Sequence, residues 1–274
     1  MILRYLAEKA GGHPRYFKLC MHIFNFLSLI GFKAKYHTHR FMSNVLNAPP
    51  DISYREGVDA LRKESMCVLA EQRKKSPKEM LYMHGITHYQ GLDLLHIPGA
   101  RPTETRFKEY DLYNLINPND RVLDLGCNNG FLLIYAAYIY NCECVGVDHN
   151  AYTIKVGEIC VDYLGLNEKV KLHHSGIDEY VRDNAVDGYF SKVISFATHF
   201  TNDGGYRKTL EEHLTLNHMV LCSGGMLLFE THMTHSSEDS FNEILAVCSN
   251  GLFTCRVNMF IESVNRRFIV LEKI

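Results

Sequence analysis

The sequence contains nine cysteines but no Cys-x-x-Cys pair. An odd number of scattered cysteines in a chain of 274 residues does not match the spacing of a disulfide framework. The tightest pair, Cys142 and Cys144, is closer than a usual pair of zinc ligands. We therefore expect small buried thiols in a reducing compartment, and no disulfide scaffold.

The sequence also lacks an apolar run long enough to cross a bilayer, and no secretory signal is present. The most apolar stretch near the start, FKLCMHIFNFLSLIGF at 17–32, is short and is interrupted by Lys18, His22 and Asn25. Basic residues surround it. Residues 15–40 therefore either lie on an anionic membrane surface or form a helix that packs on the main domain, and we favour the packed helix. The expected location is the cytoplasm, with the inner face of a membrane as the alternative.

Tryptophan is absent, and the formal net charge is only -2. The charge is unevenly distributed: Lys and Arg exceed Asp and Glu in residues 1–110, and the reverse holds in residues 111–274. A basic N-terminal part favours an anionic partner or is simply a solvated face. No dense cluster of basic residues with interleaved aromatics occurs outside 17–32, which argues against a nucleic-acid-binding surface.

What is present is a change of pattern along the chain. Residues 1–98 have mainly helical periodicity, clearest at 17–32, 57–75 and 76–85, and a loop is predicted from 86 to 106, followed by a helix at 106–116. From there, strand-like runs alternate with helical segments. The predicted strands are 121–126, 143–148, 169–174, 192–198 and 224–231, and the predicted helices are 131–140, 151–165, 205–219 and 237–251.

The last two segments, 253–262 and 266–274, are strand-like and have no helix between them. They should pair antiparallel at one side of the sheet. The sequence thus predicts an α/β fold: a Rossmann-like, doubly wound, mostly parallel sheet of seven strands with an antiparallel final strand. We expect a helical N-terminal region, 1–98, followed by the α/β domain, 99–274.

The segment RVLDLGCNNG, 121–130, is the most informative part of the sequence. A strand runs into a turn with two glycines, where the backbone can approach a ligand closely. The next strand ends in Asp148, an acid placed to accept hydrogen bonds from ribose hydroxyls. NAD would need a GxGxxG turn, but Asn128 replaces the middle glycine. Asp124 suits an ammonium better than a phosphate, so S-adenosylmethionine fits better than NAD.

Four segments in order, VLDLGCNNGFL, GVDHN, VISFATHF and GGMLLFETH, resemble the class I S-adenosylmethionine-dependent methyltransferases. The resemblance covers roughly 120–274. GARPTETRFKEYDL, 99–112, is similar to a branch that holds tRNA wobble-uridine enzymes and polysaccharide-capping methyltransferases.

The resemblance implies a set of cofactor-binding residues. Asp124 and the turn would hold the methionine and ribose side, Asp148 the ribose hydroxyls, Ile177 and Asp178 the adenine, and Arg106 the methionine carboxylate. A structural charge at a helix start is the alternative for Arg106. The full set is Arg106, Asp124, Gly126, Cys127, Asn128, Gly130, Asp148, His149, Asn150, Ile177, Asp178 and Phe196.

Methyl transfer to oxygen needs a base near the methyl group. His199, directly after the fourth predicted strand, is our first candidate, since histidine titrates near neutral pH. Glu230 and His232, after the fifth strand, should face the same edge and would bind a sugar hydroxyl or assist the base. A structural histidine and a helix cap are the alternatives. No metal is expected, although His84 and His88, and His232 and His235, are spaced as pairs. We interpret Cys127 as a small residue that fits the turn, not as a nucleophile.

The predicted function is O-methylation of a glycan or of a small hydroxylated acceptor. The glycan is either soluble or lipid-linked. An enzyme of the same fold that modifies RNA or tRNA is the main alternative. An NAD-dependent oxidoreductase and a non-catalytic cofactor-binding scaffold are less favoured. The sequence does not identify the acceptor or the oligomeric state.

Overall fold

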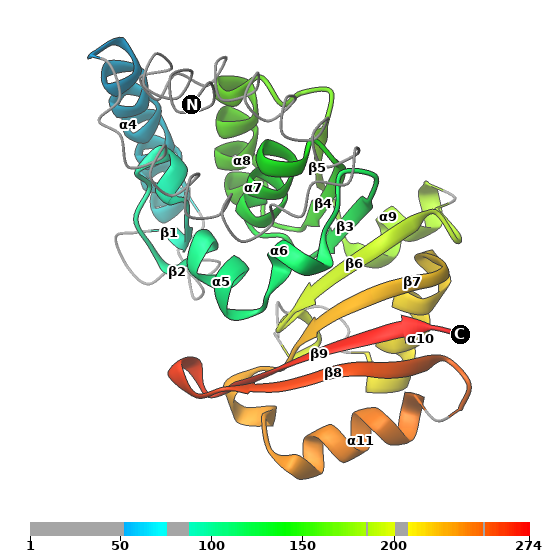
Figure 1. Ribbon diagram of the computed structural model, residues 1–274. Helices are drawn as coiled ribbons and strands as arrows, with labels where there is room; N and C mark the ends of the chain where they lie inside the picture. The colour runs from blue at the N-terminus through cyan, green and yellow to red at the C-terminus, as the bar shows by residue number, and fades with distance from the viewer. Residues whose placement is uncertain (1–51, 76–87, 185, 201–207, 249) are drawn as a thin grey trace, which may run out of the picture.

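The computed structural model describes residues 52–75, 88–184, 186–200, 208–248 and 250–274. Seven strands form one sheet in the order β5-β4-β3-β6-β7-β9-β8 (Figure 1). Strands β3 to β7 pair in parallel, and β9 is antiparallel to both of its neighbours. The predicted fold, with its antiparallel final strand, is confirmed. The strands are β3 (Arg121–Leu125), β4 (Glu143–Asp148), β5 (Val170–His174), β6 (Phe190–Phe196), β7 (Leu221–Glu230), β8 (Phe253–Ile261) and β9 (Arg266–Lys273).

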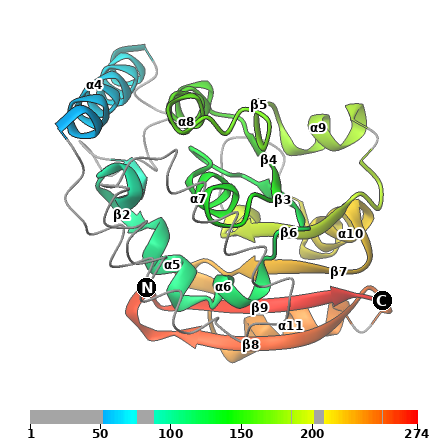
Figure 2. The same cartoon turned by 45° about the horizontal axis from the view of Figure 1, so that its top comes forward.

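Helices lie on both faces of this sheet (Figure 2). One face carries α4 (Ile52–Lys75), α7 (Phe131–Tyr140) and α8 (Ala151–Leu164). The other carries α9 (Ile177–Asp183), α10 (Leu210–Val220) and α11 (Glu238–Cys248). Buried side chains form two separate hydrophobic clusters, one on each face. The doubly wound arrangement leaves the carboxyl ends of the parallel strands uncovered by these helices, and that edge is where such folds bind ligands.

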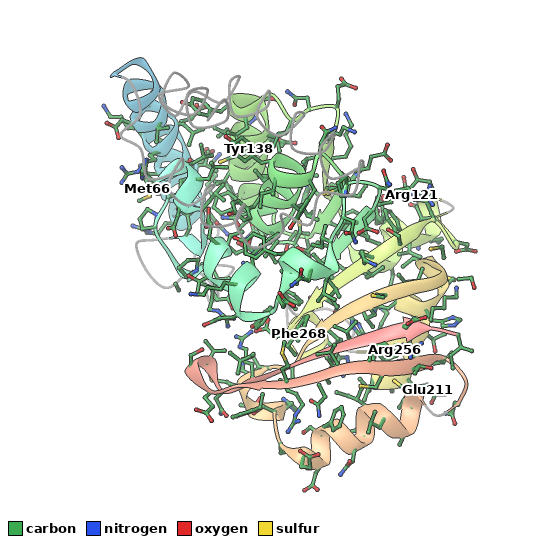
Figure 3. The ribbon with its side chains drawn as sticks, in the orientation of Figure 1. Met66, Arg121, Tyr138, Glu211, Arg256 and Phe268 are labelled. Atoms are coloured by element: carbon green, nitrogen blue, oxygen red, sulfur yellow. The ribbon has the colours of Figure 1, made fainter. Side chains whose placement is uncertain are left out.

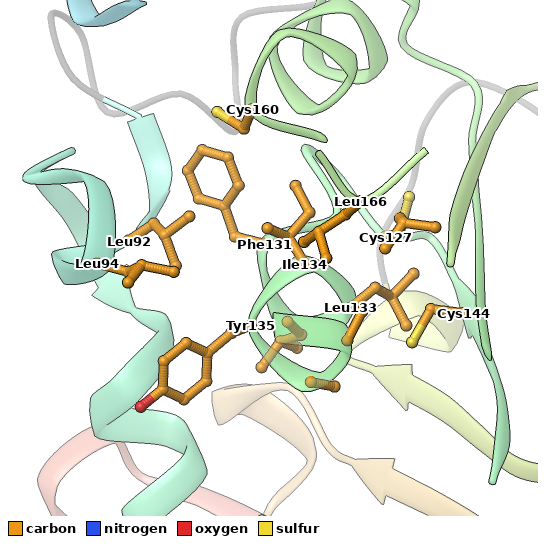
Figure 4. Close-up of a cluster of buried hydrophobic side chains, with 14 of the residues drawn as sticks. Leu92, Leu94, Cys127, Phe131, Leu133, Ile134, Tyr135, Cys144, Cys160 and Leu166 are labelled. Atoms are coloured by element: carbon orange, nitrogen blue, oxygen red, sulfur yellow. The ribbon is translucent and has the colours of Figure 1, made fainter. Parts of the chain in front are cut away.

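The segment FLLIYAAYIY forms α7, and its composition reflects its burial. Its residues 131–137 are all buried, so the helix needs no polar face. Figure 4 shows Phe131, Ile134 and Tyr135 among the side chains of the larger cluster, with Leu92 on one side and Cys160 on the other. Five of the described cysteines, 127, 142, 144, 160 and 248, are free and buried as predicted, whereas Cys67 is exposed and Cys222 and Cys255 are half-buried.

The structure corrects the prediction for residues 86–116. The predicted loop contains two short parallel strands, β1 (His88–Gly91) and β2 (Gly99–Pro102), with a 3-10 turn, η2 (Asp93–Leu95), between them. The single helix expected at 106–116 is two helices, α5 (Thr103–Glu109) and α6 (Leu112–Leu115). They are separated at Asp111, whose φ of 52° is incompatible with a continuous α-helix. Strands this short carry too little periodicity to be detected in a sequence.

The helix predicted at 57–75 is present as α4. Its buried residues Val58, Leu61 and Leu69 belong to the same cluster as Cys160 and Leu164 of α8. This part of the N-terminal region therefore packs on the main domain. The predicted segments 15–40 and 76–85 lie outside the described residues. Within the residues that are described, no helix is both long and apolar enough to span a bilayer.

Candidate active site

The glycine-rich turn joins the end of β3 to the start of α7 at the carboxyl edge of the sheet. Gly126, Asn128 and Gly130 have positive φ angles of 83°, 57° and 66°. Contact also excludes a side chain at Gly126, because a Cβ there would lie 2.8 Å from the hydroxyl oxygen of Thr198. The turn is as tight as the sequence predicted, and it packs directly against the segment that follows β6.

The backbone N–H groups of this turn are engaged within the protein. Those of Gly126 and Cys127 donate to the carbonyl of Val147, at 2.8 and 3.0 Å. The N–H of Asn128 donates to the carboxylate of Asp148 at 2.8 Å. A dinucleotide fold needs such N–H groups for its pyrophosphate. Their use inside the protein supports the exclusion of NAD that Asn128 suggested.

Gln90 of β1 fixes the turn from outside. Its Nε2 donates to the carbonyl of Cys127 at 3.1 Å, and its Oε1 accepts from the N–H of Phe131 at 3.2 Å. The side chain thereby occupies a donor in the first turn of α7, where a phosphate would otherwise bind. No sequence pattern indicates this role, because Gln90 lies 37 residues before Cys127 in a segment predicted as loop.

Asp124 and Arg106 are buried and interact electrostatically across the turn. Burial raises the pKa of the Asp124 carboxyl to about 7, with Arg106 opposing the shift and Asp148 adding to it. Burial likewise lowers the pKa of the Arg106 guanidinium. Nε and one terminal nitrogen of Arg106 have no hydrogen-bond partner among the described residues. A buried carboxyl and an unsatisfied guanidinium that interact electrostatically are complementary to the ammonium and carboxylate of an amino acid.

Asp148, at the end of β4, accepts from two backbone N–H groups, those of Asn128 at 2.8 Å and Asn150 at 2.9 Å. These two bonds fix the carboxylate at the end of the strand, beside the glycine turn. The His149 side chain is exposed, with Nδ1 3.7 Å from Asp148. The Asn150 side chain instead caps α8, because its oxygen accepts from the N–H of Tyr152 at 3.0 Å. Asn150 therefore shapes the strand-helix junction.

The residues predicted for adenine open α9. Ile177 is half-buried and packs against the cluster on that face. Asp178 is exposed and pairs with Lys208. A contact between Asp178 and an adenine amino group would have to share or replace this ion pair.

The end of β6 has an unusual backbone. Phe196 contacts Tyr110 and Phe268 edge-on, with ring centroids 5.3 and 6.0 Å apart; Phe268 is labelled in Figure 3. The next residue, Ala197, has a φ of 59°, which costs a non-glycine residue about 1–3 kcal/mol. Its N–H donates to the carbonyl of Glu230 at 2.9 Å. Such strain clusters at functional sites, and here it redirects the chain immediately before His199.

His199 lies in a short 3-10 helix, η3 (Thr198–Phe200). Thr198 links this helix to the end of β3, because its hydroxyl donates to the carbonyl of Leu125 at 2.7 Å. On its other side, the His199 ring lies 5.1 Å from the ring of His213. Burial lowers the pKa of His213 to about 3, so His213 is neutral at physiological pH and holds Ser195 at 2.9 Å. The structure thus brings His199 next to the glycine turn.

Glu230 does not lie at an open edge, contrary to the expectation from the sequence. The side chain is 1% exposed, and Oε1 accepts from Tyr110, from Arg101 at 3.2 Å and from Arg266 at 3.1 Å. A carboxylate that is held by two guanidinium groups and a phenol is a poor base for a substrate hydroxyl. Glu230 is therefore not proposed as the base.

His232 is half-buried in a local turn, with Nδ1 2.9 Å from the hydroxyl of Thr234. Burial lowers its pKa, with Arg266 and His235 adding to the shift and Glu230 opposing it. A neutral imidazole accepts protons, so His232 stays the second candidate for the base.

Cys127 contributes its backbone to the turn and its side chain to the core. Burial raises the pKa of the thiol far above its usual range, and the sulfur faces Gly146 of β4. This agrees with its interpretation as a small residue that fits the turn. Across the described part of the chain, no three His, Cys, Asp or Glu residues gather where they could hold a metal ion; His84 lies outside that part.

The residues present fit S-adenosylmethionine on structural grounds. Besides Arg106, the side chains of Asn128 and Asn129 in the turn keep buried polar atoms without a partner among the described residues. Orphaned polar atoms beside a ligand-binding turn are satisfied when a ligand supplies the missing partners. Arg106 and Asp124 would hold the methionine end, and Asp148 the ribose.

Comparisons with known proteins find related sequences. A curated tRNA U34 carboxymethyltransferase from Aliivibrio salmonicida (strain LFI1238) is 26% identical over 122 residues, which are 44% of this chain and 35% of that protein. A probable fatty acid methyltransferase from Pseudomonas putida is 38% identical over 80 residues, 29% of this chain and 19% of that protein. The chain thus matches about a third or less of the length of these curated relatives.

Solved structures of low identity are also similar. A SAM-dependent methyltransferase from Aquifex aeolicus has a TM-score of 0.48 and 13% identity, covering 62% of this chain and 93% of its own. A geranyl diphosphate methyltransferase in complex with SAM has a TM-score of 0.48 and 12% identity, covering 63% and 85%.

A family model described as a methyltransferase domain matches residues 116–253, which is half of the chain. The match begins just before β3 and ends at the start of β8, so it includes the glycine turn, Asp148 and the His199 segment. The chain belongs to this methyltransferase family, and the methyltransferase domain predicted from the sequence is confirmed.

Proposed function

We propose that the protein transfers a methyl group from S-adenosylmethionine to an oxygen of a hydroxylated acceptor, with His199 as general base. The observation that supports this most directly is the position of His199. The strained Ala197 and the hydrogen bond from Thr198 to Leu125 fix the segment that carries His199 beside the end of β3 and the glycine turn. The carboxylates around that turn have other surroundings: Asp124 is buried and interacts electrostatically with Arg106, Asp148 accepts hydrogen bonds from the turn, and Glu230 is buried.

Each residue has a defined task in this reaction. When bound, the donor supplies an electrophilic methyl group on a sulfonium. Asp124 and Arg106 orient the amino-acid end, and Asp148 holds the ribose, which fixes the direction of the methyl group for in-line attack. His199 takes the proton of the acceptor hydroxyl as the new C–O bond forms, and the electrons of the broken C–S bond stay on sulfur.

The acceptor is proposed as a glycan or a small hydroxylated metabolite. The N-terminal region, 1–98, is proposed to contact the acceptor, a partner or a membrane surface, in a cytoplasmic protein. Modification of tRNA is the second candidate, favoured by the 26% identity to the tRNA U34 carboxymethyltransferase. Outside 17–32, the sequence has no dense cluster of basic residues with interleaved aromatics, which favours the first candidate.

A turnover assay tests the proposal. The purified chain is incubated with S-adenosylmethionine and, separately, tRNA, glycans in soluble or lipid-linked form, or a panel of hydroxylated metabolites, and S-adenosylhomocysteine is measured. Turnover with a hydroxylated acceptor that is lost in His199→Gln supports the proposal. Turnover with tRNA alone would overturn the choice of acceptor. Calorimetry with S-adenosylmethionine and NAD provides the parallel binding test, and absence of donor binding would overturn the proposal altogether.

A further inference from the structure

Three arginines gather near Glu230, at the end of β7, and we call Arg101, Arg106 and Arg266 the guanidinium cluster; the sequence indicated a role for Arg106 alone. Arg106 is 3% exposed and Arg266 is 7% exposed. Arg101 comes from β2, Arg106 from α5 and Arg266 from the first position of β9. Arg106 lies within electrostatic range of both Arg101 and Glu230. Three cations therefore share a buried site with one carboxylate.

The hydrogen bonds within the cluster do not satisfy its donors. Oε1 of Glu230 accepts from Arg101 at 3.2 Å and from Arg266 at 3.1 Å. Arg266 reaches the hydroxyl of Tyr89 at 3.4 Å with its other terminal nitrogen. Nε of Arg266, like Nε and a terminal nitrogen of Arg106, has no partner among the described residues. Buried guanidinium N–H groups are normally paired, so the cluster lacks acceptors.

The site also has too little negative charge to balance its arginines. The three arginines outweigh Glu230 and Asp124, even when Asp124 is fully ionised. Binding of S-adenosylmethionine, the methyl donor of the proposed function, does not balance this positive charge, because its ammonium and sulfonium outweigh its single carboxylate. That carboxylate can satisfy Arg106, which interacts electrostatically with Asp124. Nε of Arg266 then still lacks an acceptor, and the buried site carries more positive charge than before.

On the basis of the proposed function, we propose that Arg266 and Arg101 bind a carboxylate of the methyl acceptor beside Glu230. The acceptor is thus a hydroxylated acid, such as an acidic sugar or a hydroxycarboxylate, and not a neutral polyol. A planar carboxylate matches the fork of a guanidinium and brings one negative charge. A dianionic phosphate would place two charges next to the Glu230 carboxylate, which disfavours it.

The test uses acetate as the probe, so that the acceptor need not be known. Thermal unfolding is followed with sodium acetate against sodium chloride at equal ionic strength, with saturating S-adenosylmethionine to occupy the donor's own carboxylate site. We expect a saturable rise in Tm with acetate but not with chloride. Arg266→Gln should weaken the apparent acetate affinity roughly tenfold or more, as expected for a lost charged hydrogen bond. Arg256→Gln is the matched control, on the exposed surface of β8 (Figure 3).

Arg266→Lys keeps the charge but removes the fork, so it should fold and still bind acetate weakly. Donor affinity, measured by calorimetry, separates the two proposals. Arg266→Gln should leave it within about twofold, whereas Arg106→Gln should lower it roughly tenfold or more. A wild type that responds equally to acetate and chloride would overturn the acceptor carboxylate. An Arg266→Gln variant that weakens donor binding as much as Arg106→Gln would overturn it too. A wild type that binds no donor would instead overturn the proposed function.

Discussion

The carboxyl edge of the sheet has two sides that are built in different ways. The donor side, at the ends of β3 and β4, is made from residues close together in the sequence: Asp124, the turn and Asp148. Its hydrogen bonds are mostly backbone bonds within and beside that turn. The second side, at β6, β7 and β9, joins His199 and Glu230 to Arg101 and Arg266, which come from opposite ends of the described chain. A local motif supplies the acids and glycines of the first side, whereas long-range packing assembles the second.

If the two sides have separate tasks, a change on one should leave the other intact. His199→Ala should lower the turnover rate by about two to four orders of magnitude, because the acceptor proton loses its base. Donor affinity should barely change. In the wild type, the rate should rise with pH through the histidine pKa, since only neutral imidazole accepts a proton.

The measurement is a pH-rate profile beside a melting curve and donor calorimetry. His218→Gln is the control, because His218 packs on Phe253 at the opposite edge of the sheet. A folded His199→Ala variant with near-normal turnover would transfer the base role to His232.

Asp148→Ala should weaken binding of the methyl donor, which His199→Ala should leave nearly unchanged. Loss of a charged hydrogen-bond acceptor should weaken donor binding by about 1.5–3 kcal/mol. Calorimetry measures this, with the exposed Asp162→Asn on α8 as the control. Unchanged affinity in a folded variant would mean that the ribose does not contact Asp148.

Gln90→Leu probes how the donor side depends on a distant residue. The buried N–H of Phe131 and carbonyl of Cys127 would both lose their partner, so the free energy of unfolding should fall by about 1–3 kcal/mol. Urea denaturation measures it. Donor affinity should fall as well, because the turn is no longer held. A stable variant with normal affinity would show that the local motif forms the turn unaided.

The smallest expected effect is a change in proton uptake at Asp124. Its folded pKa, about 7, lies above the unfolded value of 3.8. Between roughly pH 4 and 7 the folded chain therefore holds more protons, and the contribution of Asp124 to stability is lost as pH rises through that window. An ammonium bound beside Asp124 favours its ionised form, so donor binding at pH 7 should release up to about half a proton.

Calorimetry in buffers of different ionisation enthalpy measures this release. Asp124→Asn should abolish both the proton release and the stability slope. A release that persists in Asp124→Asn would assign the proton to another group.

Local patterns in the sequence were enough to predict the α/β fold and the order of strands and helices from 121 onward, except for α9, a helix of seven residues that was not predicted. They also supplied the residues proposed for the donor side. These depend on alternation of apolar runs, on glycines that adopt positive φ, and on acids at strand ends, all of which act over a few residues. Two predictions were wrong because they depended on contacts that local patterns do not contain. Residues 86–116 were predicted as a loop and one helix, because short strands and the break at Asp111 depend on what they pack against. Glu230 was expected at an open edge, because its position after β7 says nothing about its neighbours.

The surroundings of Glu230 and the support of the glycine turn come instead from long-range packing. Tyr110, Arg101 and Arg266 reach one carboxylate from three different parts of the chain, and Gln90 reaches the turn from β1. No periodicity in the sequence predicts these side-chain contacts, because a side chain can pair with any residue that the topology brings near. The burial of those charges, which sets their electrostatics, is likewise a property of the packed chain.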